Sequence, residues 1–171
     1  MECDVCGSAR VIRREVEGYL LEECQLCGNL QGDDEAVARV EELREGRQRG
    51  FDDEIVPLTA ALESTGVFKV VHSSAGDPRT NESPYLFFSL LKNDTAYIER
   101  LLRTLELANR ETRLRWLIEL SLQKEIVYML RPRFWMPPAQ ISPEDIRTAR
   151  KDLPVLARLL RRDLSLSWWH V

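Results

Sequence analysis

The sequence predicts an α+β fold, in which a small N-terminal β-hairpin module is followed by an antiparallel or mixed sheet packed with helices. Three observations lead to this prediction. All four cysteines lie within the first 27 of 171 residues, and the rest of the chain contains both short β-rich runs and helical spacings of apolar residues. Hydrophobic residues make up 44% of the chain, which is enough for one compact core beside a small appendage.

The four cysteines fall in two motifs of the same form, Cys3-Asp4-Val5-Cys6-Gly7 and Cys24-Gln25-Leu26-Cys27-Gly28. Two thiolates separated by two residues can bind one metal ion from a tight turn, and the glycine lets backbone amides approach the sulfurs. Together the motifs supply the four ligands of a tetrahedral zinc site, predicted to be Cys3, Cys6, Cys24 and Cys27. Because such a site leaves no position for water or substrate, the predicted zinc ion is structural.

Other uses of the cysteines compete with a zinc site. Disulfides need an oxidising compartment, yet the N-terminus lacks a charged segment followed by an apolar export signal. No apolar run approaches the length of a membrane span either, so we expect the protein in the cytoplasm. An iron–sulfur cluster or a catalytic dithiol remains as an alternative.

The residues between the two motifs predict a β-hairpin. Residues 11–16 are rich in β-branched side chains, Glu17-Gly18 supplies a turn, and residues 19–23 lead back to the second motif. This arrangement resembles the zinc ribbons of nucleic-acid and translation proteins. About thirty residues bury too little apolar surface to fold alone, whereas metal binding contributes on the order of 10 kcal/mol.

The domain organisation is predicted as a zinc ribbon over residues 1–32, a helical linker over 33–50 and an α+β domain over 51–171. Asp33 and Asp34 offer an N-cap for a linker helix that runs from Glu35 to Glu45. The glycines at either end of residues 46–50 then end that helix.

The α+β domain is expected to begin with a helix capped by Asp52, Asp53 and Glu54, with Pro57 in its first turn. Two strands follow, over residues 67–72 and 85–91. The second strand is nearly all apolar, so it is predicted to be buried on both faces. The polar residues 73–84 form the loop between them.

The second half of the domain is predicted to start with a helix over residues 95–108, whose apolar residues recur at spacings of three and four. Alternation over residues 113–123 predicts a strand that pairs as a hairpin with residues 126–130; a single helix over 111–130 is the alternative. Two helices are expected to close the chain, one from Ser142 to Lys151 and a second capped by Asp152.

Residues 52–91 resemble the wybutosine-synthesis tRNA methyltransferase family. The resemblance rests on an Ile-Val-Pro-Leu helix, a glycine, a strand and then residues 72–77, which lie where the family has Ser-Ser-Cys-Ser-Gly-Arg. Ser73 and Gly76 coincide with that motif, whereas Ser74 and Asp77 stand in place of its cysteine and arginine. The resemblance implies a related α+β architecture and a ligand loop; the two replacements give little support for methyl transfer.

The loop after the first strand also has chemistry of its own. Consecutive amides at residues 74–76 could bind an anion, and neighbouring side chains could titrate or bind phosphate. An ordinary connection between strands is the alternative interpretation. The sequence contains no glycine-rich phosphate loop and no nucleophile elbow, so we favour a non-enzymatic role. The ligand-loop candidates are His72, Ser73, Ser74, Gly76, Asp77 and Arg79.

Charge is distributed unevenly along the chain, whose net charge is -4. Residues 1–97 carry ten Lys and Arg against nineteen Asp and Glu, whereas residues 98–171 carry fourteen against nine. The basic C-terminal half could face phosphate or an acidic partner. The candidates for partner binding are Arg10, Arg13 and Arg14 on the ribbon, and Trp168 and Trp169 at the C-terminal end.

These patterns favour a zinc-ribbon binding protein that recognises RNA or a protein partner. One alternative is a tRNA-modifying enzyme with its ligand loop at residues 73–84. Another is an oligomeric scaffold protein, in which the aromatic C-terminal end makes the contact between copies.

Overall fold

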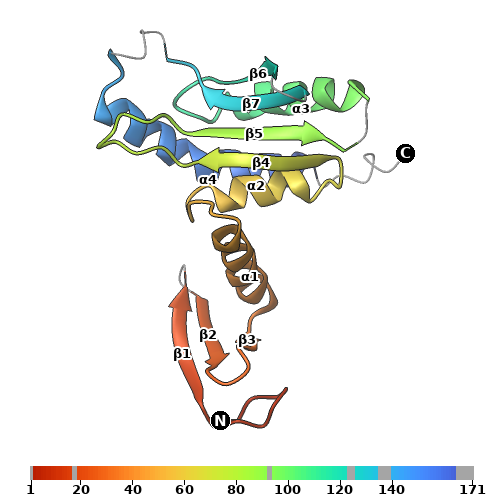
Figure 1. Ribbon diagram of the computed structural model, residues 1–171, viewed down its shortest axis with the longest axis vertical. Coiled ribbons are helices and arrows are strands. Elements are labelled where there is room, and N and C mark those ends of the chain that lie inside the picture. The colour runs from red at the N-terminus through yellow and green to blue at the C-terminus, as the bar shows by residue number, and fades with distance from the viewer. Residues whose placement is uncertain (1, 17–18, 92–93, 123–125, 135–139, 165–171) are drawn as a thin grey trace. The chain divides into compact units, whose positions relative to one another are not determined.

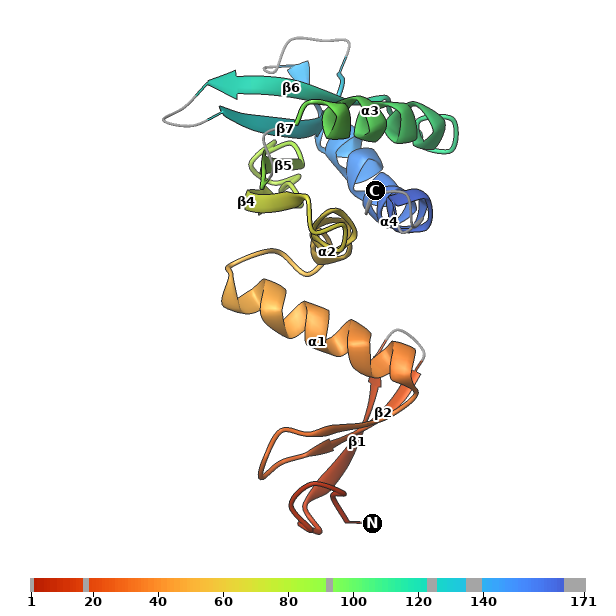
Figure 2. The same cartoon turned by 90° about the vertical axis from the view of Figure 1, so that its right-hand side faces the viewer.

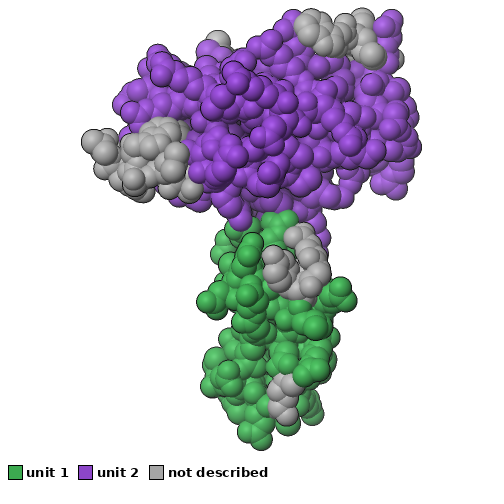
Figure 3. All heavy atoms as spheres, turned by 180° about the vertical axis from the view of Figure 1, so that it is seen from behind, with its two compact units in different colours: residues 1–45 green, residues 46–171 purple. Residues whose placement is uncertain are grey.

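The computed structural model describes residues 2–16, 19–91, 94–122, 126–134 and 140–164, and these contain four helices and two antiparallel sheets (Figure 1). The predicted α+β class is therefore confirmed. Contacts divide the chain into two compact units, residues 1–45 and 46–171, which Figure 3 colours separately. The C-terminal candidates Trp168 and Trp169 lie outside the described residues. None of the helices in the described part of the chain is long and apolar enough to cross a membrane.

The first unit contains a three-stranded antiparallel sheet. Its strands are β1 (Val11–Val16), β2 (Tyr19–Cys24) and β3 (Leu30–Gly32), in the order β1-β2-β3. The predicted hairpin is β1 and β2, while β3 adds a short third strand that the sequence did not indicate. Helix α1 (Asp34–Gln48) follows, and the Asp33 carboxylate caps it by accepting hydrogen bonds from the amides of Glu35 and Ala36.

The second unit is a four-stranded antiparallel sheet with helices on one side (Figure 2). Its strand order is β4-β5-β7-β6. Strands β6 and β7 pair as a hairpin, so the hairpin prediction for residues 111–130 is confirmed over the single helix. The elements are α2 (Val56–Glu63), β4 (Phe68–Ser74), β5 (Tyr85–Leu90), α3 (Ala96–Ala108), β6 (Trp116–Leu122), β7 (Ile126–Pro132) and α4 (Pro143–Leu164).

Strand β5 is buried on one face only, and the prediction that both faces are buried is wrong. Leu86 and Phe88 are each fully buried beneath the helices. Tyr85, Phe87 and Ser89 alternate with them and remain partly exposed. The reason is that α2, α3 and α4 all lie on the same side of the sheet (Figure 2).

The chain closes with one helix and not two. Ser142 caps α4 as predicted, because its hydroxyl accepts a hydrogen bond from the Asp145 amide at 3.2 Å. Asp152 does not cap a second helix. Its side chain is buried within α4 and accepts hydrogen bonds from the backbone amides of Arg113 and Leu114, each at 2.9 Å.

The acidic residues before α2 do not cap that helix, although Pro57 lies in its first turn as predicted. The N-cap residue is Ile55, which makes no side-chain capping hydrogen bond. Asp52 accepts a hydrogen bond from the amide of Ala75 at 2.8 Å. The other two acidic side chains bind arginines, Asp53 with Arg47 and Glu54 with Arg150.

Candidate metal centre

The two cysteine motifs fold into the same turn. In each, the amide of the glycine donates a hydrogen bond of 2.8 Å to the carbonyl of the first cysteine. The amide of that cysteine in turn donates to the carbonyl five residues further on, at 2.9 Å. Gly7 and Gly28 have φ values of 67° and 75°, a left-handed conformation that glycine adopts without strain. The repeated sequence therefore produces two equivalent metal-binding turns.

The turns bring the four sulfurs together. The Sγ atoms of Cys3 and Cys27 lie 3.6 Å apart and those of Cys6 and Cys24 lie 3.5 Å apart. All four Sγ atoms lie within 4.8 Å of one another. A tetrahedral zinc ion with Zn–S distances of about 2.3 Å sets sulfur–sulfur separations of about 3.8 Å. The four cysteines, all free thiols, are thus positioned to bind one metal ion, consistent with a zinc-binding site.

Backbone amides favour the thiolate form of the first cysteine in each motif. The amides of Cys27 and Leu26 lower the pKa of Cys24 to about 6, against the effect of burial. In the other motif, the amides of Cys6 and Val5 lower the pKa of Cys3. Both of these cysteines are buried, at 2% exposure or less. Backbone amides therefore approach the sulfurs of Cys3 and Cys24, as expected from the glycine after each motif, and they stabilise the thiolate form of both.

The second cysteine of each motif has a raised pKa instead of a lowered one. The Ser8 amide lowers the pKa of Cys6, but the thiols of Cys27 and Cys24 and partial desolvation outweigh it and raise the pKa to about 12. The pKa of Cys27 is also raised. Four thiolates this close repel one another, so full deprotonation requires a bound cation.

The arginines of the hairpin are engaged with glutamates. Arg13 pairs with Glu22 at 3.2 Å, and Arg14 pairs with Glu23 at 2.8 Å. Residues 1–45 carry five Lys and Arg against twelve Asp and Glu, a net charge of -7. The first unit is therefore acidic, and partner binding by Arg10, Arg13 and Arg14 stays a prediction.

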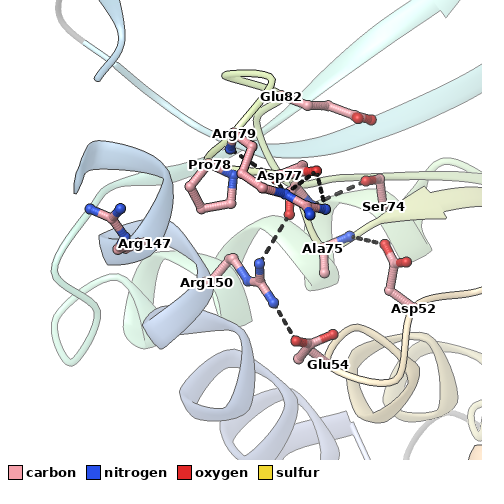
Figure 4. A pocket seen from close by; sticks show the side chains of 11 residues that line it. Asp52, Glu54, Ser74, Ala75, Asp77, Pro78, Arg79, Glu82, Arg147 and Arg150 are labelled. Atoms are coloured by element: carbon pink, nitrogen blue, oxygen red, sulfur yellow. Dashed lines mark hydrogen bonds and ion pairs between the residues drawn. The ribbon is translucent and has the colours of Figure 1, made fainter. Parts of the chain in front are cut away.

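The predicted ligand loop borders a pocket of about 600 Å³ in the second unit (Figure 4). Four of its six candidates line the pocket, namely Ser74, Gly76, Asp77 and Arg79. The other two lie on β4. Ser73 is buried, and its hydroxyl has no hydrogen-bond partner among the described residues, whereas His72 is exposed and its Nδ1 lies 3.1 Å from the hydroxyl of Tyr85.

The loop amides form hydrogen bonds within the protein. The amide of Ala75 donates to Asp52, that of Gly76 to the Ser74 hydroxyl at 3.1 Å, and that of Asp77 to a carbonyl at 3.0 Å. Gly76 has a φ of 78°, and a Cβ there would lie 2.7 Å from the backbone of Glu82. The loop is thus tightly closed on itself, and its role in ligand binding stays a prediction.

The remaining walls of the pocket come from distant parts of the sequence. Arg147 and Arg150 reach it from α4, and Glu54 reaches it from the segment before α2 (Figure 4). Arg150 bonds to Glu54 and, at 3.4 Å, to the carbonyl of Gly76. Sequence reasoning missed these residues, because nothing in their local patterns distinguishes them from a solvated helix face.

No family model, curated protein or solved structure matches the chain. The resemblance of residues 52–91 to the wybutosine-synthesis tRNA methyltransferases therefore has no support from a family match.

Proposed function

We propose that this protein is a zinc-ribbon RNA-binding protein, in which a structural zinc ion folds the first unit and the second unit binds the RNA. The observation that carries the zinc assignment is the placement of four cysteine sulfurs within 4.8 Å of one another. Four thiolates fill the coordination sphere of a tetrahedral zinc ion, so no position is left for substrate or water. The proposed role of the metal is therefore structural, and the proposed role of the protein is binding.

Elemental analysis of the full chain, purified under reducing conditions, tests the metal. We expect one zinc ion per chain and no absorption in the visible range. Iron with visible absorption would instead assign an iron–sulfur cluster. Protein that carries no metal, even after incubation with zinc, would overturn the assignment.

The charge of the second unit supports RNA as the partner. Residues 46–171 carry nineteen Lys and Arg against sixteen Asp and Glu, a net charge of +3, in contrast to the acidic first unit. Among the described residues, four exposed cations around α3 and α4 form no ion pair: Arg103, Arg110, Arg113 and Lys151. Such cations attract the phosphates of a nucleic acid and make its affinity depend on salt.

Fluorescence anisotropy with a labelled single-stranded RNA tests the RNA assignment. We expect binding at low salt, with log K falling linearly as log salt rises. The double variant Arg110→Gln and Lys151→Gln should lower that slope by roughly one to two. Arg115→Gln is the matched control, because Arg115 is already paired with Glu106 at 2.7 Å. If RNA does not bind even at low salt, the RNA assignment is wrong.

A protein partner of the first unit is a second candidate function, and the cysteine motifs favour it. Val5 and Leu26 occupy the same position of the two motifs and are 70% and 68% exposed. With the net charge of -7, they would suit a basic protein that has an apolar contact. Affinity capture by the full chain, compared with the Val5→Ser and Leu26→Ser double variant, tests this function. Equal capture by both proteins would exclude the motif surface.

A further inference from the structure

We infer that the helix-free face of the β4-β5-β7-β6 sheet is a platform on which single-stranded RNA bases stack, centred on His72, Tyr85 and Phe87. The inference rests on the proposed RNA-binding function and deepens it by naming the strand state of the RNA and the surface that contacts it. The four cations around α3 and α4 bind phosphates of the same RNA, whereas the platform makes the contacts with the bases.

The platform face is left open by the architecture of the unit. Helices α2, α3 and α4 lie on one side of the sheet, and no described helix of the second unit lies on the other (Figure 2). Leu86 and Phe88 point toward the helices, so Tyr85, Phe87 and Ser89 point away from them. A central strand therefore presents two partly exposed aromatic rings on this face.

A β-bulge in the edge strand adds the third ring. The register between β4 and β5 shifts between Val70 and His72, so the alternation of β4 changes face at that point. As a result Val71 is 54% exposed, His72 is exposed beside it, and Ser73 turns into the core. Without the bulge, His72 would point toward the helices and Ser73 would face solvent.

The three rings are arranged in advance of binding. The rings of His72 and Tyr85 are nearly parallel, with centroids 5.6 Å apart and an interplanar angle of 9°. The Tyr85 hydroxyl lies 3.1 Å from His72 Nδ1, which holds the pair together across the two strands. Phe87 meets Tyr85 at 5.4 Å and 65°. Exposed rings on a sheet give bases stacking partners that do not depend strongly on base identity.

Phosphate-binding groups lie beside the rings. Lys69 and Ser89 are partners across β4 and β5, and both line a pocket of about 440 Å³ with Arg49 and Phe51. The Arg49 guanidinium is held 4.5 Å above the Phe51 ring and donates a hydrogen bond of 2.8 Å to the Val70 carbonyl. Because Arg49 is also paired with Glu63, the exposed ammonium of Lys69 is the group at this end of the row of rings that suits the backbone of a nucleic acid.

The distribution of charge on the face indicates at which end the phosphates of the RNA lie. Glu63 pairs with Arg49, and Glu119 pairs with Arg131 through two hydrogen bonds, so these carboxylates are neutralised. Burial raises the pKa of Tyr85, and the nearby carboxylates of Glu82 and Asp52 add to that rise; these two carboxylates make the Tyr85 end acidic. Phosphates are therefore expected at the Lys69 end.

Anisotropy titrations with a labelled single-stranded RNA of about 12 nucleotides, using the full chain, test the platform. Tyr85→Ala with Phe87→Ala should weaken binding at least about 30-fold, since each stacked base contributes roughly five- to a hundredfold. Tyr85→Phe keeps the ring but loses the hydroxyl that holds His72, so it should weaken binding less than the double alanine variant does. Lys69→Gln should weaken binding uniformly across sequences and lower the salt slope by about one. Duplex RNA of the same length should compete poorly because its bases are not accessible.

The controls separate this inference from the proposed function. Leu120→Ala removes another exposed side chain, 59% exposed, from the opposite face of the same sheet, and should leave affinity unchanged. Melting temperatures of all variants report whether each remains folded. If wild type binds RNA and the folded double variant binds equally well, the platform is wrong while RNA binding stands. If wild type binds no RNA at low salt, both fail.

Discussion

The two units of this protein are stabilised in different ways. In the first, few side chains are fully buried, and two of them are the metal-site cysteines Cys3 and Cys24. In the second, large side chains such as Phe68, Phe88 and Trp116 are enclosed between three helices and a sheet. Under the proposed zinc assignment, one metal ion takes the place of a hydrophobic core in the short first unit, whereas the longer second unit has a core of its own.

Loss of one metal ligand should unfold the first unit alone. This is the largest effect that we expect. We expect Cys24→Ser to abolish stoichiometric zinc binding and to unfold residues 1–32, because metal binding contributes on the order of 10 kcal/mol to such a fold. Zinc content and amide NMR signals of the ribbon measure this. The second unit should keep its native signals.

Gln25→Ser is the matched control for that change, since Gln25 is exposed and lies next to Cys24 without offering a sulfur. It should retain zinc and native signals. Full zinc stoichiometry in Cys24→Ser would contradict the four-thiolate site.

Loss of the buried Asp152 carboxyl group should break the second unit alone. Its oxygens accept hydrogen bonds from two amides and from Trp116 Nε1 at 3.3 Å, so Asp152→Ala removes the acceptor of one buried and two partly buried donors. We expect a loss of about 3–4 kcal/mol in the free energy of unfolding of this unit. Denaturant titration followed by tryptophan fluorescence measures it.

Zinc stoichiometry should be unchanged in Asp152→Ala. This result would show that the first unit keeps its metal site when the second unit is destabilised. Glu106→Ala is the control, because it removes only an exposed ion pair with Arg115 and should cost less than about 1 kcal/mol. A similar loss in both variants would show that the buried carboxyl group has no special role.

The smallest expected effect concerns the start of α4. Ser142→Ala removes the hydroxyl that caps the helix and that bonds Asp145 at 2.7 Å, and should cost about 1 kcal/mol. Hydrogen bonds from the hydroxyl and amide of Ser142 lower the pKa of Asp145 from 3.8. A lowered pKa adds stability above pH 3.8, which is lost as pH falls through the folded value.

The difference between Ser142→Ala and wild type should therefore be full near neutral pH and shrink in acid. Unfolding titrations at pH 7 and at pH 3 and below measure it. A difference that stays constant down to complete protonation would mean that Asp145 takes no part in the cap.

The sequence by itself determined the parts whose structure depends on near neighbours. The spacing of Cys3 and Cys6, with glycine after them, suffices for a metal-binding turn because its hydrogen bonds close within six residues. The apolar spacing of α3 and the alternation of β6 likewise need only a generic core to pack against. Ser142 capped its helix as predicted because the hydroxyl and the amide it binds are three residues apart.

Only the tertiary structure decided features that depend on distant partners. Asp152 has the local pattern of a helix cap, but its hydrogen-bond donors lie 36 to 39 residues earlier in the chain, at the start of β6 and just before it. The sequence of β5 predicts burial on both faces, yet the packing of all three helices on one side leaves Tyr85 and Phe87 partly exposed. The bulge that turns His72 toward them arises from pairing between two strands. Burial and side-chain direction are set by what packs against an element, and no local pattern specifies that neighbour.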